Sequence, residues 1–216
     1  MLIENWMTKD IVCGTPEMSM MKASKIMKER GVGRLPVVNE VGVLLGLVSD
    51  RDIKEASPSK ATTLDMHELY YLLSEIKLKD IMTKKVVTIK KGETVERAAQ
   101  LMLEHNFGGL PVVDEDNKVV GMVTDSDVFK VLVRITGVME GGVQIGVRLP
   151  NQPGGLVPVL DYLKDHGARL MSLLTSCEPA EVGSRDVYLR IRDMDKTALN
   201  ALKDEMHKQF DIIYWV

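Results

Sequence analysis

A hydroxyl residue followed three positions later by an aspartate occurs twice in the sequence. Ser49 and Asp52 lie in the stretch GLVSDRDI, and Thr124 and Asp127 lie in the stretch GMVTDSDV. At a strand-to-helix junction, such a pair can form a capping box that satisfies free amides of the first helical turn. The same carboxylate, with its neighbouring hydroxyl, can also accept hydrogen bonds from a vicinal diol such as that of a ribose. The two interpretations are compatible, and both stay open.

Arginines accompany only the first of these two motifs. Arg51 directly precedes Asp52, and Arg34 directly precedes the run LPVV, whereas the matching positions of the second motif hold Ser126 and Gly109. Guanidinium groups suit phosphate oxygens by their charge and their planar donor geometry. The alternative is that both arginines are solvated surface charges.

The two motifs belong to an internal repeat without gaps. Trp6–Ile53 aligns with Ile81–Val128 at a constant offset of 75 positions, with Leu35–Val38 falling on the identical Leu110–Val113. Agreement along the whole segment indicates one structural unit that occurs twice. Two copies are too few for a solenoid, so a paired module is expected.

Each copy predicts the element order β-α-β-β-α. A short strand, residues 10–14 or 85–89, leads to a helix, then to two strands around LPVV and Gly-x-Val, and then to a last helix. The first helix of each copy has capping residues at both ends. These are Ser19 and Thr94 at the N-termini, and Gly31 and Asn106 at the left-handed C-termini.

The last eighty residues differ in character from the repeat. Alternating apolar residues in GGVQIGVRL predict a strand, and the segments that follow predict the order β-α-β-β-α-β, which is the ferredoxin-like motif. The turn NQPGG separates the first strand from the first helix. Gly154 and Gly155 in this turn either only shape the turn or let the backbone approach a ligand closely.

Composition excludes several classes of function. The chain has 216 residues and a formal net charge of −3, and its basic residues are dispersed, so nucleic acid is not an expected partner. Cys13 and Cys177 are isolated, which fits neither a disulfide framework nor a zinc site of about four ligands. No apolar run approaches the roughly 20 residues that span a bilayer. We therefore expect a cytoplasmic protein with no transmembrane segment and no metal site.

The repeated motifs, taken together, strongly resemble a pair of cystathionine β-synthase (CBS) domains, the Bateman module, over about residues 1–135. The resemblance implies two units packed around a pseudo-twofold axis, with two clefts that commonly hold AMP, ADP, ATP or S-adenosylmethionine. It also implies a nucleotide-binding set in which aspartates contact the ribose, hydroxyls assist them and arginines handle phosphate. Those residues are Asp52 and Asp127, Ser49 and Thr124, and Arg34 and Arg51.

The C-terminal segment, about residues 141–216, resembles an ACT domain through LPNQPGGLVPVLDYLKDHGA. The resemblance implies pairing edge to edge and a ligand site for an amino acid or another small molecule at Asn151, Gly154 and Gly155. Arg169 stands where amino-acid-binding members have a second asparagine. A CBS pair followed by an ACT domain is similar to acetoin-utilisation accessory proteins.

The predicted architecture is therefore α+β in three parts: residues 1–60 as the first CBS unit, 61–137 as a connecting helix with the second unit, and 138–216 as the ACT-like domain. We expect a homodimeric regulatory protein whose ligand is an adenine nucleotide or S-adenosylmethionine and whose partner is a metabolic enzyme. No nucleophile elbow, phosphate loop or dinucleotide fingerprint is present, so we expect no catalytic residues and no catalytic cofactor. The alternative is a ligand-free interaction scaffold.

Overall fold

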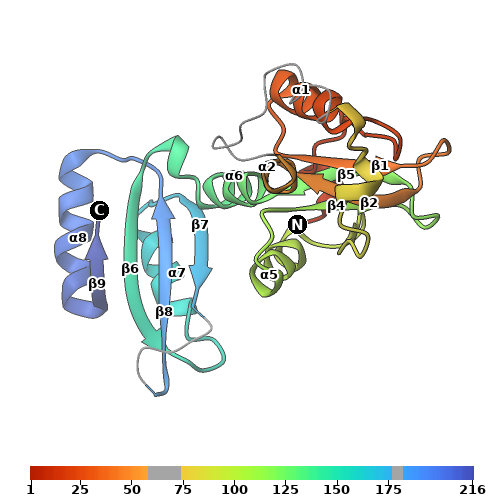
Figure 1. The fold of residues 1–216 in the computed structure, drawn as a ribbon. Helices are drawn as coiled ribbons and strands as arrows, with labels where there is room; N and C mark the ends of the chain where they lie inside the picture. Colours follow the sequence, from red (N-terminus) through yellow and green to blue (C-terminus); the bar gives the residue numbers. More distant parts are fainter. Residues whose placement is uncertain (58–73, 177–181) are drawn as a thin grey trace. The chain divides into compact units, whose positions relative to one another are not determined.

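The computed structural model describes residues 1–57, 74–176 and 182–216. The chain divides into two compact units, Met1–Val128 and Phe129–Val216, and each is described by itself (Figure 1). The predicted connecting helix falls largely on residues 58–73, and Cys177 falls on residues 177–181, so both lie outside the described residues.

The first unit contains the two repeat copies up to Val128, so that the last helix of the second copy continues into the second unit. The first copy follows a short 3-10 helix, Ile3–Asn5, and consists of α1 (Met20–Arg30), β1 (Arg34–Val38), β2 (Leu44–Ser49) and α2 (Asp50–Ala56). The second copy consists of α4 (Leu78–Ile81), β3 (Ile89–Lys90), α5 (Val95–His105), β4 (Gly109–Val113), β5 (Val119–Thr124) and α6 (Asp125–Thr136). The strands β1 and β2 pair antiparallel, and the second sheet has the order β3-β4-β5.

The predicted strand at residues 10–14 was wrong. Only Gly14 pairs there: its N–H donates to the Pro36 carbonyl at 2.8 Å, and it accepts from the Val38 N–H at 2.9 Å. Local chemistry limits this pairing, because the Ile11 N–H turns back to the Lys9 carbonyl at 3.0 Å. Two residues after Gly14, Pro16 has no amide hydrogen to extend a ladder. In the second copy, the predicted strand at 85–89 is reduced to β3.

The predicted capping residues are confirmed. Ser19 accepts a hydrogen bond from the Lys22 N–H at 3.3 Å at the start of α1. Thr94 does the same from the Arg97 N–H at 3.2 Å at the start of α5. Both helices end in left-handed residues, which are Gly31 with φ 64° and Asn106 with φ 55°. Helix bounds in both copies are therefore fixed by local sequence.

Reciprocal backbone hydrogen bonds join the two copies. Leu47 and Thr83 exchange N–H···O bonds of 3.0 and 2.9 Å, and Met122 and Thr8 exchange bonds of the same two lengths. Leu47 and Met122 are equivalent in the repeat, as are Thr8 and Thr83, so each copy presents the same two residues to the other. Such isologous contacts define a twofold relation, and the copies therefore pair with the predicted pseudo-twofold symmetry.

From β6 onward, the second unit is one antiparallel sheet with two α-helices. Its elements are β6 (Val143–Pro150), α7 (Val157–Asp165), β7 (Leu170–Thr175), β8 (Ser184–Ile191), α8 (Lys196–Gln209) and β9 (Asp211–Trp215). The strand order is β7-β8-β6-β9. Alternate residues of β6 and β8, such as Val147 and Leu189, are buried against Leu163 of α7 and Leu202 of α8. The two helices therefore cover one face of the sheet.

Candidate functional site

The first hydroxyl–aspartate motif forms a complete capping box at the start of α2. The Ser49 side chain accepts from the Asp52 N–H at 3.3 Å. In return, Asp52 Oδ2 accepts from the Ser49 N–H at 2.7 Å and from the Ser49 hydroxyl at 2.6 Å. The other carboxylate oxygen, Oδ1, makes no hydrogen bond with a described residue. Capping therefore occupies only one of the two oxygens.

The second motif has the same geometry. Asp127 Oδ2 accepts from the Thr124 N–H at 3.0 Å and from the Thr124 hydroxyl at 2.8 Å. The Asp127 N–H donates to the Thr124 hydroxyl oxygen at 3.3 Å. Asp127 is 5% exposed, whereas Asp52 is half-buried. The capping interpretation is thus confirmed in both copies, and it is compatible with a ligand at the second oxygen of Asp52.

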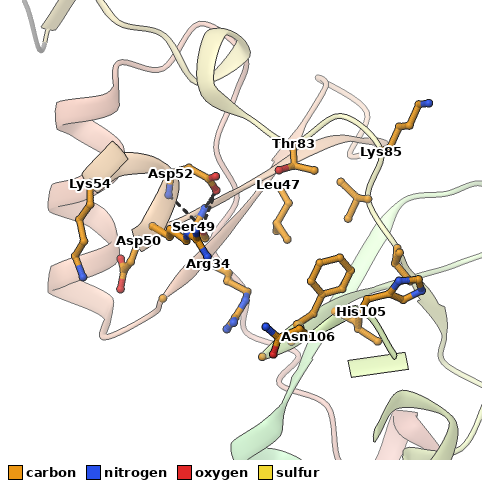
Figure 2. A pocket seen from close by; sticks show the side chains of 18 residues that line it. Arg34, Leu47, Ser49, Asp50, Asp52, Lys54, Thr83, Lys85, His105 and Asn106 are labelled. Carbon is orange, nitrogen blue, oxygen red and sulfur yellow. Dashed lines mark hydrogen bonds between the residues drawn. The ribbon is translucent and has the colours of Figure 1, made fainter. Parts of the chain in front are cut away.

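A cavity of about 710 Å³ lies between the two copies, beside the first motif (Figure 2). One side comes from the first copy and the other from the second copy. The first copy contributes Gly33, Arg34, Leu47, Ser49, Asp50, Arg51, Asp52 and Lys54. The second contributes Thr83, Lys85, Val86, Val87, His105, Asn106, Phe107, Gly108, Gly109 and Leu110. This volume is in the range of small-molecule sites.

The cavity brings together four of the predicted nucleotide-binding residues. Ser49 and Asp52 line it at the start of α2, and Arg34 and Arg51 line it as well. Figure 2 shows the Arg34 side chain extending past Ser49 into the open space between the two copies. The structure therefore gives both arginines a place beside Asp52. The predicted residues of the second motif, Thr124 and Asp127, are not among the residues that line this cavity.

Sequence reasoning missed four residues that line the same cavity. His105 and Phe107 flank the C-cap of α5, and their rings stack with centroids 5.4 Å apart and an interplanar angle of 23°. Phe107 is 43% exposed, which is unusual for an aromatic ring that could otherwise pack in a core. Lys54 and Lys85 add two cations. Of these four residues, only Lys54 had a signal in the sequence, which was its position two residues beyond Asp52.

Two adjacent glycines leave room for Arg34. A Cβ atom on Gly108 would press on Nη2 of Arg34 and would lie 3.1 Å from Asp125 Oδ2. On Gly109, a Cβ atom would lie 3.5 Å from Nη1 of Arg34 and 3.1 Å from the Val123 carbonyl oxygen. The absence of side chains at Gly108 and Gly109 therefore lets the guanidinium of the first copy lie against the backbone of the second.

The arginine next to Asp52 is held by its own helix. Arg51 Nε donates to Glu55 Oε1 at 2.7 Å, one helical turn away. This hydrogen bond to Glu55, with the attraction between the two charges, raises the pKa of Arg51 above its ordinary value. Arg51 therefore stays cationic throughout the range in which proteins are folded.

The predicted ligand residues of the second unit lie around a smaller cavity. Asn151, Gly154 and Gly155 line a cavity of about 210 Å³, together with Gln152 and Arg185, which the sequence did not single out. Gly154 has φ +78°, a conformation that favours glycine. A Cβ on Gly155 would collide with the Pro150 carbonyl oxygen. The turn therefore requires both glycines, whatever else they do.

Across residues 1–57, 74–176 and 182–216, no group of three or more His, Cys, Asp or Glu side chains could hold a metal ion. In the same ranges, no helix is long and apolar enough to cross a membrane.

Comparison with known proteins identifies the repeated unit. The family model described as CBS domain matches residues 3–59 and 78–134. The uncharacterized protein MJ1225 of Methanocaldococcus jannaschii is 31% identical over 130 residues, covering 60% of this chain and 46% of that protein. The CBS domain-containing protein DDB_G0289609 of Dictyostelium discoideum is 33% identical over 134 residues, covering 62% of this chain and 92% of that protein. The chain thus spans less than half the length of the first relative.

Solved structures share this fold. The CBS domain pair of protein MJ0100, in complex with 5′-methylthioadenosine and S-adenosyl-L-methionine, is 29% identical with a TM-score of 0.51, covering 61% of this chain and 95% of that chain. CBSX2 in complex with AMP is 31% identical with a TM-score of 0.52, and the match covers 62% of this chain and 97% of CBSX2. An acetoin utilization protein (AcuB) from Vibrio cholerae is 26% identical with a TM-score of 0.53, and the match covers 65% of this chain and 96% of that protein.

Proposed function

The chain belongs to the CBS domain family, and from this premise we propose that it is a ligand-sensing regulatory protein and not an enzyme. Its ligand contains adenosine and is AMP, ADP, ATP or S-adenosylmethionine, held in the clefts of the CBS pair. The observation that carries this proposal is the cavity of about 710 Å³ in which Ser49 and Asp52 lie opposite His105, with Phe107 among the lining residues of the second copy. Structural relatives crystallised with AMP, S-adenosylmethionine and methylthioadenosine support it.

The chemistry of the cavity suits an adenosine group. Asp52 Oδ1 has no hydrogen-bond partner among the described residues and can accept from ribose hydroxyls. A base could stack on the exposed ring of Phe107, since base–aromatic stacking contributes about 1–3 kcal/mol per base in nucleic-acid complexes. The capping box holds the Asp52 side chain in one orientation before any ligand arrives. Binding would thus need little reorganisation at this residue.

Regulation follows from linkage between binding and the arrangement of the two copies. A ligand that contacts both copies favours the arrangement in which those contacts fit, and so shifts the population toward it. We propose that the protein is a homodimer and that the shift is transmitted across its twofold interface to a metabolic partner enzyme. Asp127 and Thr124 would serve a second, related cleft.

We propose the predicted domain boundaries, residues 1–60, 61–137 and 138–216, with an ACT-like ferredoxin domain as the last part. The element order of β6 to β9 and the strand order β7-β8-β6-β9 support this assignment. The small cavity at Asn151, Gly154 and Gly155 is the proposed site for an amino acid or similar small molecule. Loss of a calorimetric amino-acid signal on changing Asn151→Ala tests this site.

Thermal unfolding tests the proposed function. Adenosine, AMP, ADP, ATP and S-adenosylmethionine are added to the wild type and to Asp52→Ala and Asp127→Ala. A ligand at about 100 times its dissociation constant adds about 2.7 kcal/mol of stability, which raises Tm by roughly 5–10 °C for a chain of this size. Asp116→Ala, in an exposed turn, is the control for loss of a carboxylate. The ligand-dependent rise should be lost in Asp52→Ala and kept in Asp116→Ala.

The complete capping boxes favour one alternative. Because Ser49–Asp52 and Thr124–Asp127 already have a structural role, the motif needs no ligand to explain it. If no adenosine compound raises Tm in the wild type, a ligand-free interaction scaffold becomes the better account of this protein.

A further inference from the structure

Cations outnumber carboxylates in the cavity beside Asp52. The cationic residues that line it are Arg34, Arg51, Lys54 and Lys85, and the carboxylates are Asp50 and Asp52. Within the described part of the chain, neither Lys54 nor Lys85 forms an ion pair. The cavity therefore carries positive charge that described protein groups do not neutralise.

The matching positions of the other repeat copy have lost every one of these cations. At the constant offset of the repeat, the replacements are Gly109 for Arg34, Ser126 for Arg51, Phe129 for Lys54 and Asp10 for Lys85. The hydroxyl–aspartate pair, in contrast, is kept in both copies. What the copies share is thus the diol-binding pair, and what distinguishes them is the cationic set.

We propose that the cavity beside Asp52 selects adenosine nucleotides that carry a chain of two or three phosphates over uncharged adenosine derivatives. The inference rests on the proposed function, since it assumes that this cavity binds adenosine. Phosphate oxygens accept charge-assisted hydrogen bonds from guanidinium and ammonium groups. A phosphate chain also brings negative charge to Arg34, Lys54 and Lys85, whereas Arg51 is already paired with Glu55.

The position of Arg34 supports this selectivity. Its guanidinium lies over Gly108 and Gly109 of the second copy, where a side chain would displace it. Arg34 extends from β1 and Lys54 projects from α2 on the other side of Ser49 and Asp52 (Figure 2). A phosphate chain attached to a ribose at Asp52 would therefore meet Arg34 on one side of the motif or Lys54 on the other.

Calorimetric titration tests the inference with adenosine, AMP, ADP and ATP, without divalent cations. The affinity of the wild type should rise with each added phosphate. Lys54→Gln/Lys85→Gln should weaken ATP binding about fivefold or more, since one exposed cation contributes up to about fivefold, and should change adenosine binding less than twofold. Lys22→Gln/Lys91→Gln removes the same charge from exposed positions outside the cavity and should leave ATP affinity within about twofold, because salt screens distant charges.

The outcomes separate this inference from the proposed function. Equal affinities for adenosine and ATP in the wild type, with adenosine binding lost in Asp52→Ala, would overturn the phosphate selectivity and leave the proposed function standing. If the preference for ATP survives in Asp52→Ala and disappears in Asp127→Ala, the preference arises at the motif of the other copy, and the inference is overturned. Absence of binding by every adenosine compound would remove both. Inorganic tripolyphosphate that matches ATP in affinity would also overturn it, because adenosine would then contribute nothing.

Discussion

Placing a methyl group on Gly108 should weaken phosphate binding without unfolding the protein. The added Cβ would press on Nη2 of Arg34, which is the free end of a flexible side chain, and would lie 3.1 Å from Asp125 Oδ2. The guanidinium can move away at small cost, but it then leaves the position from which it would contact a ligand. Gly108 does not need a left-handed conformation, so alanine is compatible with the backbone there.

The repeat supplies a matched control for this change. Gly33 is the equivalent glycine of the first copy and lines the same cavity, but a Cβ on it would meet only Asp50 Oδ2, at an ordinary contact distance of 3.6 Å. Replacing glycine by alanine at a compatible position stabilises a folded protein by about 0.4–1 kcal/mol, because it lowers the conformational entropy of the unfolded chain. At Gly108 this stabilisation should be partly cancelled by the crowding against Arg34. At Gly33, where no crowding occurs, nearly all of it should appear in the free energy of unfolding.

The expected magnitude follows from the bond that Arg34 would make. A hydrogen bond to a charged group contributes about 1.5–3 kcal/mol, so its loss weakens binding roughly 10- to 100-fold. We expect Gly108→Ala to weaken ATP binding by about tenfold, at the lower end, because the guanidinium is displaced and not removed. Gly33→Ala should change it less than about twofold, and adenosine binding should change little in either variant.

Calorimetry gives the affinities, and urea unfolding without ligand gives the stabilities. Two results would refute the reasoning. One is wild-type ATP affinity in Gly108→Ala, which would mean that Arg34 does not act on the ligand. The other is an equal loss of affinity in Gly33→Ala, which would mean that any added methyl group blocks the cavity.

Three further predictions concern the fold. Leu35→Ala, at a fully buried site, should lower the unfolding free energy by about 2–5 kcal/mol in urea, whereas Leu103→Ala, 84% exposed, should change it by less than about 0.5 kcal/mol. Asp127→Ala should cost about 1–3 kcal/mol, because the Thr124 N–H and hydroxyl lose their acceptor, and an unchanged denaturation midpoint would contradict this. Tyr162→Phe should raise the pKa of Glu205, which the tyrosine hydroxyl lowers through a 2.8 Å hydrogen bond. A lowered folded pKa contributes stability above the unfolded value of 4.5, and this contribution is lost as the pH falls through the folded pKa. The variant should therefore be less stable than the wild type above that pH, and the difference should disappear on acidification, as NMR titration and acid unfolding would show.

Local sequence predicted the elements whose determinants are themselves local. The caps at Ser19 and Thr94, the left-handed ends at Gly31 and Asn106, and the existence of the repeat follow from residue types and spacing, whereas the pseudo-twofold pairing was implied only by the resemblance to CBS domains. The strand at residues 10–14 was wrong because pairing there depends on what lies beside Gly14, not on the β propensity of DIVCG.

The site was only partly predictable, for a similar reason. Ser49 and Asp52 are identified by their spacing, because a capping box is a contact between neighbours in sequence. That Arg34 lies in the same cavity as His105 depends on how two copies pair across their pseudo-twofold axis, which no local pattern encodes. Phe107 was missed because the equivalent residue in the first copy is Val32, so its aromatic ring breaks the repeat instead of following it.

The claim that Asp52 contacts a ribose has one direct test, which is a thermodynamic cycle. Binding of ATP and of 2′,3′-dideoxy-ATP is measured by calorimetry in the wild type and in Asp52→Ala, so that any general effect of losing the cap cancels. If Asp52 accepts hydrogen bonds from the ribose, removal of the hydroxyls should weaken binding about tenfold or more in the wild type. It should then have less than about a twofold effect in Asp52→Ala. An equal loss in both proteins would show that Asp52 does not contact the ribose and that its role ends with the helix cap.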